Sequence, residues 1–215
     1  GKGEEEAPDR LPPEGFHLEA GVFVRRELIP PKAPGLPPGL EGPRTPVQTP
    51  LRLIPGSGGE SRSLGSHLFF DLEATGLSTG AGTVAFLFGL GRCREEGFEV
   101  VQWLLPDYPW EPELLRSVAE ELNRLRSEIG SLTLVSYNGR SFDTPLLQTR
   151  MLMNGIPFEP PRELDLLPIS RRLWRKSLEN CSLGTVEDGV LGVARELDVP
   201  GSLVPLRYFD YLASG

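Results

Sequence analysis

Asp71-Leu72-Glu73-Ala74-Thr75-Gly76-Leu77 directly follows the apolar run Leu68-Phe69-Phe70 and sets two carboxylates close together at the end of a predicted strand. Side chains alternate along a strand, so Asp71 and Glu73 leave the same face of it. Two neighbouring carboxylates repel each other unless they are protonated or neutralised, and divalent cations commonly neutralise such pairs. The segment therefore predicts a metal site at the carboxyl end of a strand.

A second acidic segment, Tyr137-Asn138-Gly139-Arg140-Ser141-Phe142-Asp143, follows another apolar run, Leu132-Thr133-Leu134-Val135. Asp143 is thus expected where a strand passes into a helix, and there it can meet the first two acids. Two-metal hydrolases need carboxylates that bridge ions about 3.5–4 Å apart, so we predict that all three acids are metal ligands and catalytic residues. The simpler alternative is that Asp71 and Asp143 cap helices or turns, as aspartate often does.

The composition is that of an ordinary globular protein with one core: 215 residues, 39% hydrophobic and 24% charged. A formal net charge of −8 argues against general electrostatic capture of nucleic acid, so any such contact must be local. Two cysteines, Cys93 and Cys181, are too few for a disulfide framework, and we expect a cytoplasmic protein. No signal peptide and no membrane-spanning run is predicted.

The N-terminal part differs in composition from the rest, since 12 of the 22 prolines fall in residues 1–60. We predict a Pro/Gly-rich arm over 1–60, with a hairpin around Ala20-Gly21 and a flexible joint at 56–59. Residues 61–215 form the second predicted domain. Its expected elements are strands Leu68–Leu72, Thr83–Leu90 and Phe98–Leu105 in an antiparallel meander, helix Glu113–Arg126, strand Leu132–Tyr137, and helices Thr144–Met153 and Leu166–Lys176.

The two acidic motifs resemble the D-x-E-T-T-G-L and Y-N-x-x-x-F-D motifs of the DnaQ-like, or DEDD, 3′–5′ exonucleases. A closer resemblance is to the YprB-like ribonuclease H-like domains of bacteria, and it covers roughly residues 67–212. It extends through further segments: Leu164-Asp165-Leu166-Leu167, Cys181-Ser182-Leu183, Val199-Pro200-Gly201 and Tyr208-Phe209-Asp210-Tyr211-Leu212. This resemblance implies an α/β, ribonuclease H-like mixed sheet with helices on both faces. It also implies a Mg²⁺- or Mn²⁺-dependent 3′–5′ exonuclease that hydrolyses single-stranded DNA or RNA.

Three features are predicted to contact nucleic acid. Thr75 and Gly76 allow a close backbone approach to a phosphate or a terminal hydroxyl, unless the glycine only forms a turn. Asn138 lies beside the substrate in the resembling motif, or is itself a turn former. Four cations share one face of a predicted helix, which either binds phosphates or is simply solvated. These cations are Arg171, Arg172, Arg175 and Lys176.

One part of the exonuclease pattern is missing from this sequence. Active members close the site with a fourth acid in a late H-x-x-x-D or Y-x-x-x-D motif, and no such motif stands in the right place. We expect that acid beyond Gly215, or else lost together with catalysis. Robust activity of the 215 residues would instead mean that the fourth acid is unnecessary or is supplied by another residue, such as Asp188 or Asp198. The alternatives are a catalytically incomplete nucleic-acid-binding or scaffold module, and a haloacid-dehalogenase-type phosphatase, which Glu73 makes less suitable.

Overall fold

A seven-stranded mixed sheet forms the centre of the computed structural model, which describes residues 8–30, 46–47, 62–193 and 199–214. The strand order is β1-β2-β7-β6-β5-β8-β9. β5, β8 and β9 run parallel to one another, and all the other neighbours are antiparallel. The strands are β1 (His17–Glu19), β2 (Val22–Ile29), β5 (His67–Ala74), β6 (Ala85–Arg94), β7 (Gly97–Leu104), β8 (Thr133–Ser136) and β9 (Arg162–Asp165); β3 (Pro46–Val47) and β4 (Arg62–Ser63) pair separately.

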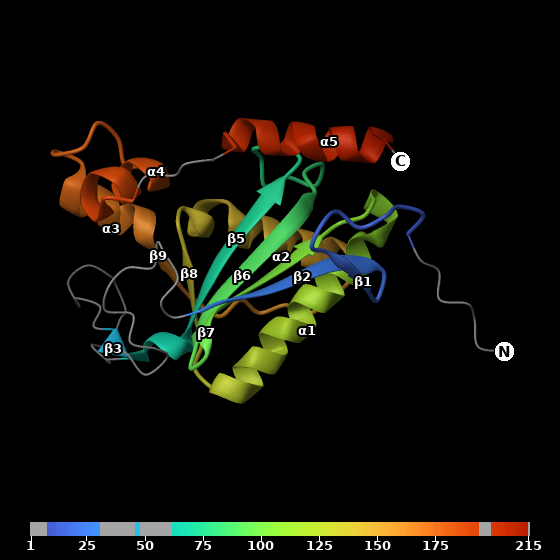
Figure 1. Cartoon of the computed structure of the whole chain (residues 1–215), viewed down its shortest axis with the longest axis horizontal. Coiled ribbons are helices and arrows are strands. Elements are labelled where there is room, and N and C mark those ends of the chain that lie inside the picture. Colours follow the sequence, from blue (N-terminus) through green and yellow to red (C-terminus); the bar gives the residue numbers. More distant parts are fainter. Residues whose placement is uncertain (1–7, 31–45, 48–61, 194–198, 215) are drawn as a thin grey trace.

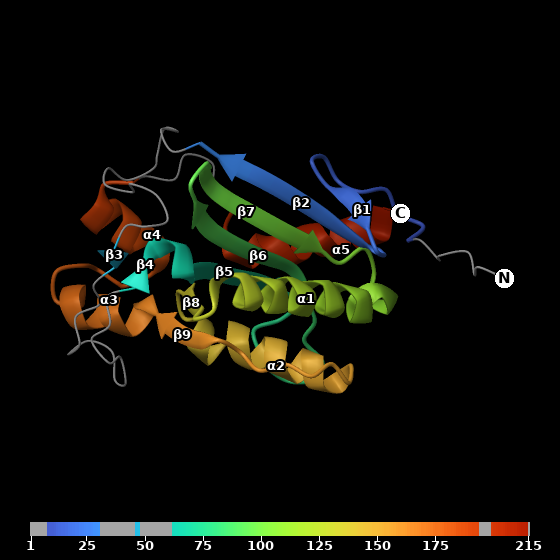
Figure 2. The same ribbon diagram turned by 90° about the horizontal axis from the view of Figure 1, so that it is seen from below.

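Helices cover both faces of this sheet. Figure 2 shows α1 and α2 side by side on the near side of the sheet, with α5 beyond it. The helices are α1 (Glu111–Ile129), α2 (Asp143–Met153), α3 (Leu166–Trp174), α4 (Leu183–Val186) and α5 (Val204–Ser214). The predicted ribonuclease H-like architecture is confirmed. None of the described helices is long and apolar enough to cross a membrane.

The main core lies between α1 and the sheet. α1 buries the predicted stripe of apolar residues, which recurs every three or four positions, against Leu68 and Trp103 of the sheet. Glu111 and Glu113 in the first turn favour the helix start, and Gly130, at φ 82°, ends it. The stripe consists of Leu114, Leu115, Val118, Leu122 and Leu125.

α5 is held on the opposite face by an irregularity in the sheet. Glu73 pairs with Leu87 but Ala74 pairs with Ala85, so Phe86 is an extra residue in β6. Such a bulge redirects a side chain, and the Phe86 ring stacks on Tyr208 of α5 with centroids 4.1 Å apart. α5 therefore lies across the carboxyl end of β5 (Figure 1). This helix was not among the predicted elements.

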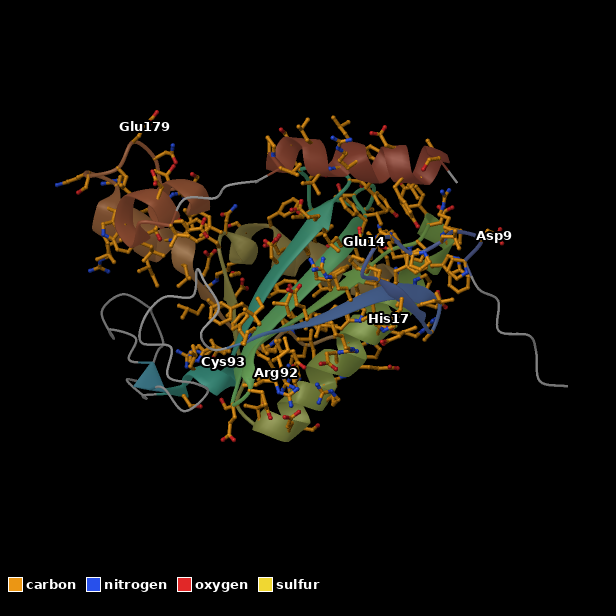
Figure 3. The ribbon with its side chains drawn as sticks, viewed as in Figure 1. Asp9, Glu14, His17, Arg92, Cys93 and Glu179 are labelled. Atoms are coloured by element: carbon orange, nitrogen blue, oxygen red, sulfur yellow. The ribbon has the colours of Figure 1, made fainter. Side chains whose placement is uncertain are left out.

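Most of the remaining elements agree with the predictions, with small corrections. The hairpin around Ala20-Gly21 is confirmed, and its second strand pairs with β7 inside the sheet. α3 ends at Trp174 rather than at Lys176. Much of the predicted arm, including the joint at 56–59, lies outside the described residues, so the division at residue 60 stays a prediction. Cys93, on β6 at the end of the sheet away from α5 (Figure 3), and Cys181 are both free thiols.

Candidate functional site

Asp71 and Glu73 leave β5 on one face, as alternation predicts. Leu72 between them is buried, whereas Asp71 is exposed and Glu73 half-buried. Gly89 of β6 stands opposite Asp71 in the register, so the paired position on β6 contributes no side chain over this carboxylate. The two acids thus lie at the carboxyl end of a central strand, with one of them open to solvent.

Asp143 reaches the same region from β8, which runs parallel to β5. It is the first residue of α2 and is 6% exposed. The turn before it is tight: Asn138 has a left-handed backbone with φ 73°, and Gly139 follows. A Cβ on Gly139 would lie 2.5 Å from Cβ of Ser136 and 3.0 Å from Oδ2 of Asp143, so this position requires glycine. The backbone of the turn therefore packs directly against the Asp143 carboxylate.

The three predicted acids influence one another electrostatically. Burial raises the pKa of Asp143 from its ordinary value of 3.8 to about 7, and the negative charges of Asp71, Glu163, Glu73 and Asp165 act in the same direction. Burial, with the charge of Asp71, likewise raises the pKa of Glu73 to about 7. Asp143 and Glu73 thus take up protons near neutral pH, and further carboxylates lie within electrostatic reach of Asp143.

Glu163 belongs to this acidic group although the sequence analysis did not propose it. It lies on β9, and its carboxylate accepts hydrogen bonds from Ser136 Oγ at 2.6 Å and from Thr144 Oγ1 at 2.9 Å. Glu163 therefore connects the end of β8 to the first turn of α2. The signal that could have revealed it is its spacing from Asp165, which repeats the alternation of Asp71 and Glu73.

Asp165 supports the turn that precedes Asp143. Its Oδ1 accepts hydrogen bonds from the backbone N–H of Asn138, at 2.8 Å, and of Leu167, at 2.9 Å. The second bond caps α3, and the first holds Asn138 in its left-handed conformation. One carboxylate thus links the start of α3 to the turn beside the site.

Thr75 and Gly76 begin the loop that follows the β5 acids. The base of the loop is closed by two hydrogen bonds, from Thr75 N to the Val84 carbonyl at 2.9 Å and from Val84 N to Thr75 Oγ1 at 3.0 Å. Ser78 and Thr83 hydroxyls lie 2.9 Å apart across the loop. Leu77 points outward and is 99% exposed. The loop thus presents an apolar side chain to solvent immediately after the acids.

The four predicted cations line one hollow on α3 and the residues just after it. The hollow has a volume of about 420 Å³ and is completed by Pro168 and Leu173. All four cations are exposed. The helix that carries this basic groove is linked to the turn beside Asp143, because Asp165 caps the start of α3 and also bonds the backbone of Asn138. The groove consists of Arg171, Arg172, Arg175 and Lys176 with these two neighbours.

The chemistry of the acids suits a hard divalent cation, because oxygen ligands and unbalanced negative charge favour one. In their present positions the side chains do not form a ready-made cage. Across the described residues, no group of three or more His, Cys, Asp and Glu side chains is placed to hold a metal ion. Metal binding by Asp71, Glu73 and Asp143 therefore stays a prediction.

The sequence and the fold are both similar to those of known proteins. Over 147 residues, 67% of this chain, the sequence is 41% identical to "Uncharacterized protein YprB" of Bacillus subtilis (strain 168). The chain spans only about a third of that relative, 34% of its length.

Among solved structures, the family B DNA polymerase of Pyrobaculum calidifontis aligns with 68% of this chain and 22% of its own, at 16% identity and a TM-score of 0.50. A chain of the ExoI/SSB-Ct complex aligns with 69% of this chain and 43% of its own, at 18% identity and a TM-score of 0.40.

The mixed sheet with helices on both faces is therefore a nuclease-like fold of the ribonuclease H type. The family model of the RNase H superfamily matches residues 68–215, which is well over half of the sequence. This chain belongs to the RNase H superfamily.

Proposed function

We propose that this chain is a metal-dependent 3′–5′ exonuclease domain that hydrolyses phosphodiester bonds of single-stranded nucleic acid. The observation that best supports it is the electrostatic influence of Asp71 and Glu73 on Asp143, because the pKa of Glu73 and that of Asp143 are both raised to about 7. Acids with strongly raised pKa values cluster at functional sites, and a bound cation displaces the protons of its ligands. Membership of the RNase H superfamily supports the same proposal.

The proposed cofactor is Mg²⁺ or Mn²⁺, held by Asp71, Glu73 and Asp143. A pair of such ions, when bound, supplies an activated water and stabilises the leaving oxygen. The protein's own part in this proposal is to hold the Asp143 carboxylate in place and to limit its hydration. Glu163 holds the helix that begins at Asp143, and the Gly139 backbone closes over the Asp143 carboxylate.

The proposed substrate path runs from the loop at Thr75 and Gly76, past Asn138, to the basic groove on α3. Because the whole chain has a net charge of −8, attraction for phosphates must come from such a local cluster. The exposed Leu77 offers an apolar surface against which a terminal base can pack. In this proposal the cations of the basic groove bind phosphates of the nucleic acid at a distance from the acids, and the 3′ end of the nucleic acid lies at the acids.

A labelled oligonucleotide assay tests this proposal directly. Single-stranded DNA and RNA, each with a free or a blocked 3′ end, are incubated with the protein and Mn²⁺. We expect slow shortening from free 3′ ends, because the fourth acid of the pattern is missing, and loss of that activity in Asp71→Asn. Equal shortening of 3′-blocked strands, or full activity of Asp71→Asn, would contradict the proposal.

A second candidate is a nucleic-acid-binding module of the same fold without catalysis. It is favoured by the lack, among the described residues, of an acidic group placed to hold an ion. This candidate predicts strand binding that is indifferent to Mn²⁺ and to Asp71→Asn. The phosphatase alternative loses its basis, because the chain belongs to the RNase H superfamily.

A further inference from the structure

The tip of the 75–84 loop is anchored to the body of the protein by a single arginine among the described contacts. Ala81 stands between Gly80 and Gly82, two residues that restrict the backbone little. Its carbonyl oxygen accepts a hydrogen bond from Nη1 of Arg150 at 2.7 Å. The bonds at the base of the loop fix its two ends, and Thr83 bonds the Gly80 carbonyl and Ser78 within the loop, so the Arg150 bond is the described contact that holds the tip against α2.

Arg150 is itself held in the interior by Glu111. Both residues are 7% exposed. Nε of Arg150 donates to Oε1 of Glu111 at 2.6 Å, and Nη2 donates to Oε2. Asn154 adds a bond to the same carboxylate at 3.3 Å. The planar guanidinium is thereby locked in one orientation, which directs Nη1 at the loop.

This arrangement is better suited to fixing a geometry than to adding stability. A buried ion pair must recover a large desolvation cost, and apolar residues of similar size often stabilise a protein as well or better. What apolar residues cannot do is donate a directed hydrogen bond to the Ala81 carbonyl. The buried pair therefore has a use that packing alone does not provide.

α2 connects this anchor to the candidate site. The helix begins at Asp143, and Arg150 lies about two turns further along it. We propose that Arg150 is a positioning residue: through the Ala81 carbonyl it sets the place of the tip of the 75–84 loop relative to the acids. That the loop faces the substrate rests on the proposed function; that Arg150 fixes the loop does not.

Hydrogen exchange of loop amides tests the positioning role without any need for activity. The key variant is Arg150→Met with Glu111→Leu, which removes the pair without leaving one charge buried. We expect exchange at residues 76–83 to be about fivefold faster or more, because one anchoring hydrogen bond is lost, while amides of β5 and β8 keep their rates. The matched control is Arg124→Met with Glu121→Leu, a pair within α1 whose removal should leave exchange in the loop unchanged.

Unchanged loop exchange in a folded Arg150→Met, Glu111→Leu protein would overturn the inference. If that variant does not fold, Arg150→Lys decides, because lysine keeps the charge but not the fork that bonds Glu111 and Ala81 together. Faster loop exchange is then still expected, and wild-type rates would overturn the inference.

Affinity for a single-stranded oligonucleotide, measured on the same variants, should fall along with loop protection. If loop exchange is faster in the variant but the wild-type protein binds no single-stranded oligonucleotide, the proposed function is refuted and the positioning role of Arg150 remains supported.

Discussion

The substitution Asp143→Asn should stabilise the metal-free protein at alkaline pH and have little effect at acid pH. Because the pKa of Asp143 is raised in the folded state, the native protein binds this proton more tightly than the unfolded chain does. The stability that the proton contributes is complete below about pH 4 and is lost as the pH rises through about 7. Asparagine has nearly the same shape and carries no charge at any pH, so the variant avoids that loss.

The size of the effect follows from the pKa shift. A change from 3.8 to about 7 corresponds at most to roughly 4 kcal/mol of unfolding free energy. Glu73 shares the repulsion and takes up protons over the same range, so Asp143→Asn alone should recover roughly 2 kcal/mol. In a domain of this size that is an increase of roughly 4–8 °C in Tm.

Urea unfolding in EDTA at half-unit steps from pH 4.5 to 8.5 measures this difference. The gap between variant and wild type should open above about pH 4 and be complete by about pH 7, and Mg²⁺ should close it by stabilising only the wild type. Asp210→Asn, at an exposed position of α5, removes the same charge and serves as the control. Parallel pH profiles for wild type and Asp143→Asn would refute the reasoning.

Three further predictions concern the surroundings of the site. Gly139→Ala should lower the free energy of unfolding by roughly 1–3 kcal/mol, because its Cβ would overlap Ser136. Gly184→Ala is the control and should not lower it, because no atom lies within 4 Å of the added Cβ. Equal unfolding curves for the two variants would contradict this prediction. Glu163→Gln should lower the pKa of Asp143, followed by carboxyl ¹³C chemical shifts, since one neighbouring negative charge is removed; an unshifted titration would argue against the electrostatic contact. Reversing the three arginines of the basic groove to glutamate should weaken single-strand binding and flatten its salt dependence, and unchanged affinity and slope would identify a merely solvated helix face. Those arginines are Arg171, Arg172 and Arg175.

The elements at the centre of the site were predictable because each has a strong local pattern. β5 and β8 are apolar runs that end in acidic turns, and the periodic stripe of α1 is enough to predict a helix. Alternation along β5 is a property of any strand, so the spacing of Asp71 and Glu73 alone is enough to place them on one face. The order of the two acidic motifs indicated the family.

The missed elements depend on tertiary contacts. β9 has only four residues, Arg162–Asp165, and it exists as a strand because it pairs with β8; Glu163 was missed with it. α5 is held by the stacking of Tyr208 on Phe86, and Phe86 is available only because the sheet register shifts there. A register shift has no signal in a single sequence. The hydrogen bond from Arg150 to the Ala81 carbonyl likewise joins two residues far apart in the sequence, and no sequence pattern predicts their contact.

The pairing of β2 with β7 has a consequence for how this protein avoids associating with itself. β2 covers β7 from Phe98 to Leu104 and shields its backbone N–H and C=O groups. A chain that started at residue 61 would expose that row of groups, and such an open strand can recruit a second molecule. β2 bears Arg25, Arg26 and Glu27, whose charges oppose further strand addition on its own outer side. The N-terminal residues therefore protect the nuclease-like sheet from edge-to-edge aggregation.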